Sequence, residues 1–292
     1  LQAFIRNDHA PKRAMAATIA GGVTNVILDL VFIYIFHWGM AGGAIATVIG
    51  SALNLLILLT HFISKNNNLK PKLYGSWIRN GIQIFQAGIS SFLLDVASGV
   101  VILIFNVQIL KYIGNTGIVV YSIISNSLLI ANSFFNGVSQ AGQPLMAANF
   151  GARQLKRVRS LRKIALITVF IFGLIFTCTG WLFPHAIINI FVIATPEITE
   201  LGTLAIRLYF TALVFMSVNV LLTTYLQSTL QALQALILSL MRGFVLSALF
   251  VFIFPAVFGT TSIWLVMPVT ELLTLIMAAV FIRRSDRREV IS

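Results

Sequence analysis

Long apolar blocks separated by short polar segments make up most of the 292-residue chain. A helix needs about 20 apolar residues to cross a bilayer. Eight blocks reach that length, at 14–36, 39–63, 80–110, 117–140, 164–188, 203–226, 235–258 and 260–282. The apolar residues run together instead of alternating with polar ones, which argues against transmembrane β-strands. The pattern therefore predicts an all-α, polytopic transmembrane bundle with eight spans.

The composition agrees with lipid as the surrounding solvent. Hydrophobic residues make up 58% of the chain and charged residues only 10%, against about 25% charged in soluble domains. A net charge of +12 would favour nucleic-acid binding on a soluble face, but the basic residues lie between the apolar blocks. We therefore expect the lipid bilayer as the surroundings and no nucleic-acid partner.

Basic residues gather at every second connection between the predicted spans. All but three of the 20 Lys and Arg lie before the first span, in the segments 64–79 and 151–163, or after the last span. Short loops rich in Lys and Arg stay on the cytoplasmic side of a membrane. The pattern predicts a multi-pass protein of the cell (inner, cytoplasmic) membrane with both ends of this chain in the cytoplasm.

A weak internal repeat predicts two related halves. A shift of 218 positions superposes Phe32 on Phe250 and Ile45 on Ile263. Such an offset fits a transporter with two six-helix halves. We divide the chain into the last two helices of one lobe, a cytoplasmic connection and a six-helix lobe with a short tail: 1–64, 65–79 and 80–292. Because the chain begins at Leu1 without Met or a signal-peptide pattern, we expect residues upstream of it.

Three acidic residues fall inside predicted spans, where a charge costs roughly 2.5–3.5 kcal/mol on insertion scales. Asp95 lies near the middle of the third span and is the candidate cation-binding residue. Asp29 lies in the first span and is expected to bond nearby backbone or Asn25. Glu271 lies in the eighth span and could pair with Arg242 of the seventh. For Asp29, Arg242 and Glu271, structural and coupling roles both stay open.

Polar side chains recur at helical spacing on three spans, which places them on one face of each helix. The candidate cavity residues are Ser91, Ser98 and Asn106 on the third span, Asn132, Asn136 and Gln140 on the fourth, and Asn219 and Thr223 on the sixth. One hypothesis is a polar chamber that receives substrate. The alternative is that amides and hydroxyls bond helix to helix, which is worth about 0.6 kcal/mol each.

Enzymatic chemistry finds little support in the sequence. The four His lie at or beyond the ends of predicted helices, so none is expected to pair with a buried Ser, Cys or carboxylate. The sequence contains no Gly-rich phosphate loop with its Lys. We predict a protein that is not an enzyme, uses no cofactor, and binds no metal beyond a coupling Na⁺.

Three segments resemble the MATE family of multidrug and toxic-compound extrusion transporters. They are RNDHAPKRAMAATIAGGVTNVILDLVFIYIFHWGMAGGAIATVIG at 6–50, NGVSQAGQPLMAANFGARQLKRVR at 136–159, and SLMRGFVLSALFVFIFPAVFGTTSIWLVMPVTELL at 239–273. The resemblance implies helices five to twelve of a twelve-helix, two-lobed transporter. It also implies antiport, in which organic cations or other amphiphiles leave in exchange for Na⁺ or H⁺ by alternating access. We expect a monomer.

The resemblance implies a role for Asp95 in ion coupling. Asp95 stands where Na⁺-coupled members carry a buried acid, seven residues after a Gly, here Gly88. The match is incomplete, because the span that would supply a second acid offers Asn219 and Thr223 instead. Na⁺ and H⁺ therefore both stay open as the coupling ion.

Two alternative functions differ in what their interior would contain. A flippase for lipid-linked oligosaccharides shares the architecture but would need several Arg or Lys in its chamber, and only Arg207 and Arg242 lie within spans. In a non-transport membrane scaffold, the polar faces of these helices would pack against one another and leave no chamber.

Overall fold

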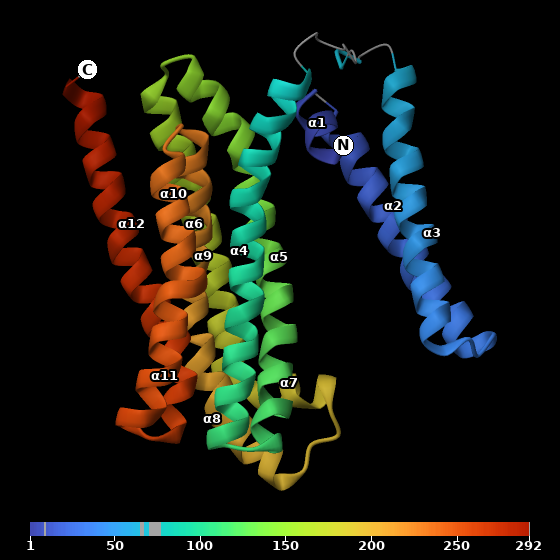
Figure 1. Cartoon of the computed structure of the whole chain (residues 1–292), viewed down its shortest axis with the longest axis vertical. Helices are drawn as coiled ribbons and strands as arrows, with labels where there is room; N and C mark the ends of the chain where they lie inside the picture. The colour runs from blue at the N-terminus through green and yellow to red at the C-terminus, as the bar shows by residue number, and fades with distance from the viewer. Residues whose placement is uncertain (9, 65–66, 70–76, 292) are drawn as a thin grey trace. The chain divides into compact units, whose positions relative to one another are not determined.

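The computed structural model describes residues 1–8, 10–64, 67–69 and 77–291, without the side chains at 3, 7, 77–80, 82–95 and 285–291. Within these ranges every regular element is a helix (Figure 1). The chain separates into two compact units, Leu1–Gly81 and Ile82–Ser292. The boundary lies close to the one expected between residues 79 and 80, while the assignment of the units to two lobes stays a prediction.

The first unit is a helical hairpin with a short helix near its ends. Its elements are α1 (Gln2–Asn7), α2 (Pro11–Leu30), the π-turn η1 (Val31–Ile35), α3 (Gly39–Leu59) and the 3-10 turn η2 (Thr60–Ile63). Pro11 takes the first position of α2, where a missing N–H costs no helical hydrogen bond. The two long helices coincide with the spans predicted at 14–36 and 39–63.

Small residues let α2 and α3 approach each other closely. A Cβ on Gly50 would lie 2.7 Å from the carbonyl oxygen of Gly21 and 2.9 Å from the Cβ of Asn25. Lipid supplies no hydrophobic force between helices, so close backbone packing at small residues holds them together. Asn25 Nδ2 also donates to Thr47 Oγ1 at 3.3 Å, from α2 to α3.

A buried polar cluster ties the two ends of this hairpin together. His61 is fully buried, with its Nε2 2.8 Å from Asp8 Oδ2 and its Nδ1 3.2 Å from Arg13 Nη1. The backbone N–H of Asn68 donates to the same Asp8 oxygen at 2.9 Å. The expectation that no His pairs with a buried carboxylate is therefore wrong. Asp8 and His61 are 53 positions apart and meet only through the packing of α2 on α3.

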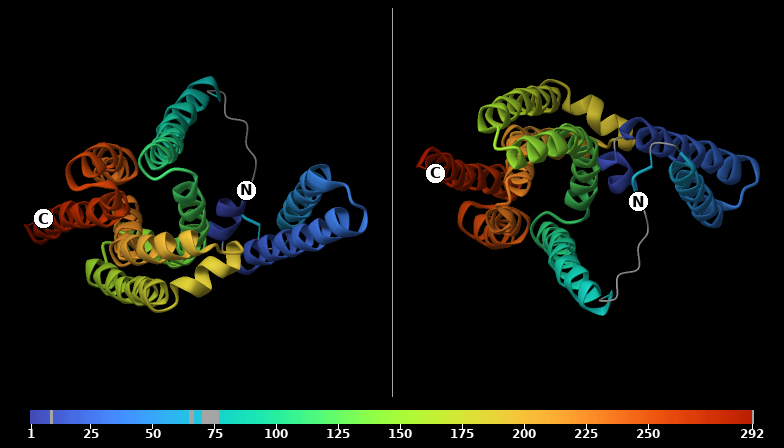
Figure 2. Two further views of the ribbon diagram at one scale, coloured as in Figure 1. Left: turned by 90° about the horizontal axis from the view of Figure 1, so that it is seen from below. Right: turned by 90° about the horizontal axis from the view of Figure 1, so that it is seen from above.

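The second unit is a bundle of helices (Figures 1 and 2). Its helices are α4 (Trp77–Tyr112), α5 (Asn115–Gly151), α6 (Leu155–Leu182), α7 (Pro184–Phe191), α8 (Pro196–Phe210), α9 (Ala212–Ser228), α10 (Ala232–Leu240), α11 (Leu246–Phe258) and α12 (Val266–Ile291). A π-turn, η3 (Met241–Val245), joins α10 to α11, and a 3-10 turn, η4 (Thr260–Leu265), precedes α12.

The predicted spans all fall on helices. Among the described residues, 7 helices are long and apolar enough to cross a membrane. The one remaining predicted span, the third at 80–110, falls on α4, which contributes the shorter apolar stretch Val96–Tyr112. The fold is thus an all-α transmembrane bundle, as the hydrophobic pattern predicts.

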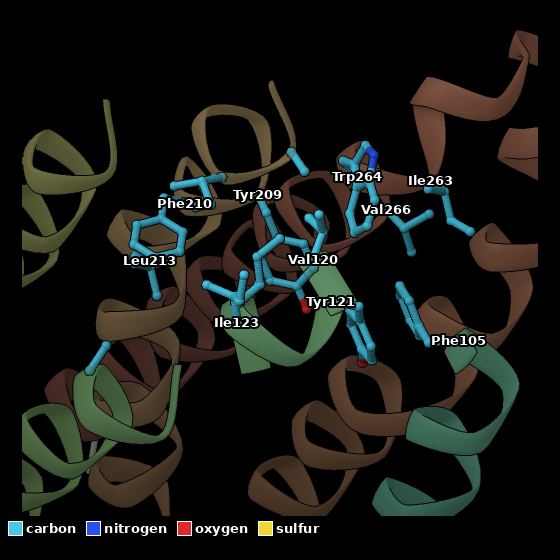
Figure 3. Packing of buried hydrophobic residues seen from close by; sticks show 14 of the residues in the cluster. Phe105, Val120, Tyr121, Ile123, Tyr209, Phe210, Leu213, Ile263, Trp264 and Val266 are labelled. Atoms are coloured by element: carbon cyan, nitrogen blue, oxygen red, sulfur yellow. The ribbon is translucent and has the colours of Figure 1, made fainter. Parts of the chain in front are cut away.

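The helix pair α8–α9 forms the inside of the second unit. In the most apolar stretch of Pro196–Ser228, 61% of the residues are buried, against at most 33% in the other membrane-length helices. α9 contacts α5, α6, α10 and α12. Figure 3 shows part of the apolar core, in which Phe105 of α4 stacks on Tyr121 of α5 with ring centroids 5.6 Å apart. The packing of α5 on α9 fixes the polar faces of these two helices relative to each other.

Two helices continue beyond their predicted spans. α5 runs to Gly151, past Pro144, and α6 already begins at Leu155. The basic segment predicted as a connection over 151–163 is therefore mostly the start of a helix. An apolar window marks only the part of a helix that lies in lipid, and a helix can extend into water beyond it.

Candidate functional site

A polar cavity of about 350 Å³ lies in the second unit among α4, α5, α9, α10 and η3. Its lining residues are Ser98, Asn132, Asn136, Val220, Thr223, Thr224, Gln227, Ser239, Arg242 and Gly243. The volume is near the lower end of pockets that hold drug-sized ligands, roughly 300–1,000 Å³. Part of each predicted polar face therefore lines a chamber, whereas the scaffold hypothesis requires these faces to close against one another.

Half of the predicted cavity residues line this chamber. They are Ser98, Asn132, Asn136 and Thr223. Three others lie elsewhere, so their assignment to the cavity is corrected. Asn106 donates to the Ile102 carbonyl of its own helix, Gln140 is exposed outside the lining, and Asn219 turns towards α12.

Helix geometry explains why Asn106 and Gln140, the last polar residues on their helix faces, do not line the cavity. A four-residue step advances about 400° around the helix, about 40° more than a full turn, and about 6 Å along it. Asn106 follows Ser98 by two such steps, and Gln140 follows Asn132 by two. Each pair is thus rotated by about 80° and separated by about 12 Å, which is enough to leave a small chamber.

The side chains of Asp95 and Ser91 lie outside the described residues. The backbone of both belongs to α4, and Asp95 precedes the cavity residue Ser98 by three positions. The cation site at Asp95 therefore stays a prediction.

A cluster of Arg242, Glu271 and Asn219 adjoins the cavity, which Arg242 lines. Arg242 Nε lies 2.9 Å from Glu271 Oε1 and forms an ion pair with it. The N–H group is not aligned for a hydrogen bond to this oxygen. Asn219 Nδ2 donates to Glu271 Oε2 at 2.7 Å and to the Glu271 carbonyl at 2.8 Å. The Arg242–Glu271 pair suggested by the sequence is present. Asn219 is a positioning residue that orients Glu271.

Arg242 lies in a π-turn, lines the cavity and pairs with Glu271. η3 interrupts the helical path from α10 to α11 at residues 241–245. The Ser247 hydroxyl donates to the Arg242 carbonyl at 2.7 Å, which holds the widened turn. Such turns within helices are frequent at functional sites. One signal for this wall is visible in the sequence, since Ser239, Arg242 and Gly243 share a helix face within a mostly apolar span.

Asp29 belongs to the first unit and lacks its expected partner. Asn25, one turn earlier, donates to Thr47 on α3. Among the described residues Asp29 makes no hydrogen bond, and its Oδ1 would lie 3.7 Å from a Cβ on Gly43 of α3. The expected bond to Asn25 or nearby backbone is therefore wrong, because Thr47 competes for the Asn25 amide.

Sequence relatives point to one family. The MatE family model matches residues 102–253. The multidrug export protein MepA of Staphylococcus saprophyticus is 27% identical over 267 residues, covering 90% of this chain and 58% of that protein. MepA of Staphylococcus haemolyticus is 26% identical over 265 residues, with the same coverage of 90% and 58%. This chain thus spans less than two thirds of the length of these relatives.

Solved structures share the fold over nearly the whole chain. An outward-facing MATE-family multidrug resistance transporter of the MOP superfamily has a TM-score of 0.86 and 20% identity, covering 97% of this chain and 64% of that one. A MOP superfamily transporter from Pyrococcus furiosus has a TM-score of 0.85 and 20% identity, covering 96% and 64%. Identities this low support the fold alone. Since the family model covers more than half of its residues, the chain belongs to the MatE family.

Proposed function

We propose that this chain forms part of an exporter of drugs and other amphiphilic compounds, a secondary antiporter that works by alternating access. The observation that carries the proposal is the polar cavity of about 350 Å³ inside a transmembrane bundle. Amides and hydroxyls on several helices offer both donors and acceptors to a partly polar ligand. The similarity to proteins named for multidrug export supports the same activity.

Coupling to Na⁺ or H⁺ belongs to this proposal and is assigned to Asp95. A carboxylate within the membrane needs a cation or a proton to neutralise it. Asp95 precedes Ser98 on α4, so an ion at Asp95 and an organic cation in the cavity would compete. Competition of this kind couples the export of the organic cation to the entry of the Na⁺ or H⁺.

The proposed setting is the cell membrane, with a monomeric protein and both ends of this chain in the cytoplasm. The support is the placement of Lys and Arg in alternate connections. The turn before α6 and the start of that helix continue this pattern, with Arg153, Lys156 and Arg157 exposed.

Dye efflux by the full-length protein tests the proposal. The change Asn136→Leu removes an amide from the cavity wall, and each lost hydrogen bond should lower the apparent affinity about 2- to 10-fold. Asn126→Leu is the matched control on the same helix. Asn126 is exposed, donates to the Ser122 carbonyl of its own helix and to no other described residue, and does not line the cavity.

The ion requirement is measured in proteoliposomes with a Na⁺ gradient or a pH gradient. Asp95→Asn should abolish the dependence of export on the gradient. Undiminished coupled efflux in Asp95→Asn would refute the assigned coupling residue. Equal efflux by wild type and Asn136→Leu at limiting dye would refute the assigned cavity.

A further inference from the structure

Arg242 is the only charged side chain among the described residues that line the cavity. Its Nε is paired with Glu271. Its two Nη atoms make no hydrogen bond with the described residues, and neither is fully buried. A guanidinium carries five N–H donors, and the four on the Nη atoms make no hydrogen bond within the described residues. The side chain is 23% exposed, which fits a donor group held at the cavity surface.

The guanidinium is held in place before any ligand arrives. Glu271 is fully buried and is itself held by the two hydrogen bonds from Asn219. The π-turn η3 and the Ser247 hydroxyl fix the backbone that carries Arg242. A donor group that is already ordered loses little conformational entropy when it binds a ligand.

The rest of the lining suits an oxyanion. The remaining described side chains there are neutral amides, hydroxyls and one Val, with Gly243 beside Arg242. No carboxylate appears among these residues, and the carboxylate of Glu271 is behind Arg242 with no exposed surface. The planar fork of Arg matches two oxygens of a carboxylate at once, which Lys cannot do.

We propose that Arg242 forms a subsite for the carboxylate of zwitterionic or anionic amphiphiles in this cavity. The inference rests on the proposed export function and names a substrate class for it. Arg242 contacts the ligand through its Nη atoms, while Glu271 and Asn219 act through Arg242 as positioning residues. The transporter then accepts compounds that carry a carboxylate in preference to otherwise identical esters.

A matched pair of fluorescent dyes tests this preference. One is a rhodamine with a free benzoate carboxylate, and the other is its methyl ester. Binding of both is measured by fluorescence anisotropy with the full-length protein in nanodiscs of phosphatidylcholine. The readout is the ratio of the two dissociation constants, which cancels any general loss of folded protein.

Three variants separate the subsite from a structural effect. Arg242→Gln combined with Glu271→Gln removes both charges and leaves no unpaired charge in the interior. In this double variant the preference for the carboxylate dye should fall about 10- to 100-fold, as expected for charge-assisted hydrogen bonds. Arg242→Lys should give an intermediate ratio. Arg207→Gln should leave the ratio unchanged, because Arg207 is exposed on α8 and bonds the Trp181 carbonyl away from the cavity.

The outcomes distinguish the subsite from the export function. An unchanged ratio in the double variant, with the ester dye still bound and exported, overturns the carboxylate subsite and leaves the export function standing. Failure of the wild type to bind or export either dye overturns both. A further set of nanodiscs contains phosphatidylglycerol. Selective weakening of the carboxylate dye there in wild type, but not in the double variant, supports the oxyanion subsite and identifies a lipid headgroup as a second source of the same chemistry.

Discussion

Removing the two charges of the Arg242–Glu271 pair, singly and together, should cause unequal losses of stability. Glu271 has no exposed surface, while 23% of the Arg242 side chain is exposed. Arg242→Gln leaves a carboxylate in the interior with only the Asn219 amide to bond it. Glu271→Gln leaves a guanidinium that still reaches the polar cavity. The first variant should therefore be the less stable of the two.

The magnitudes follow from the burial of each partner. Loss of one partner from a fully buried ion pair costs about 3–5 kcal/mol, and we expect this range for Arg242→Gln. For Glu271→Gln we expect about 1–2 kcal/mol, because the cavity solvates the remaining charge. The double variant should lie within about 2 kcal/mol of wild type, since no unpaired charge remains. The double-mutant cycle should then give a coupling energy of at least about 2 kcal/mol.

Unfolding of the full-length protein by sodium dodecyl sulfate in mixed micelles provides the measurement. Midpoints and slopes for wild type, both single variants and the double variant give the four corners of the cycle. Additive losses, with a coupling energy below about 0.5 kcal/mol, would refute the buried pair as described. A Glu271→Gln variant less stable than Arg242→Gln would refute the reasoning from burial.

Three further predictions concern stability elsewhere. Gly50→Leu should destabilise the α2–α3 hairpin by about 1–3 kcal/mol, because its Cβ would lie 2.7 Å from a backbone oxygen. Gly22→Leu should not, since nothing lies within 4 Å of its Cβ, and equal thermal melting of both variants would contradict this. Thr195→Ala should cost about 1 kcal/mol in the same melting assay, because the Thr195 hydroxyl accepts from the N–H of Ile198 at the start of α8; an unchanged midpoint would contradict the cap. The hydrogen bond from His61, followed by that from Asn68, lowers the pKa of Asp8 from 3.8 to about 2. The contribution of Asp8 to stability is therefore present above pH 3.8 and is lost as the pH falls through about 2. Asp8→Asn should flatten the pH dependence of the unfolding midpoint in that window, and an equally steep dependence would contradict the assignment.

The transmembrane architecture could be predicted because its signal is local. A span is an uninterrupted apolar run, and the prediction of 39–63 coincides with Gly39–Ile63 in the structure. The ends of helices outside lipid carry no such signal, which is why the start of α6 at Leu155 was predicted as a connection. The pairing of His61 with Asp8 was missed for a related reason. It depends on how two helices pack, and neither residue is marked by its sequence neighbours.

The candidate site shows the same division between local and tertiary information. The pairing of Arg242 with Glu271 was accessible from the sequence, because an intramembrane charge requires an opposite partner and few were available. Which of the two charges also faces the cavity was not accessible. Arg242 lies in the π-turn η3, and the widened backbone of a π-turn cannot be recognised from an apolar run in the sequence. The proposed carboxylate subsite therefore rests on tertiary information, because only the folded structure shows that Arg242 both lines the cavity and pairs with Glu271.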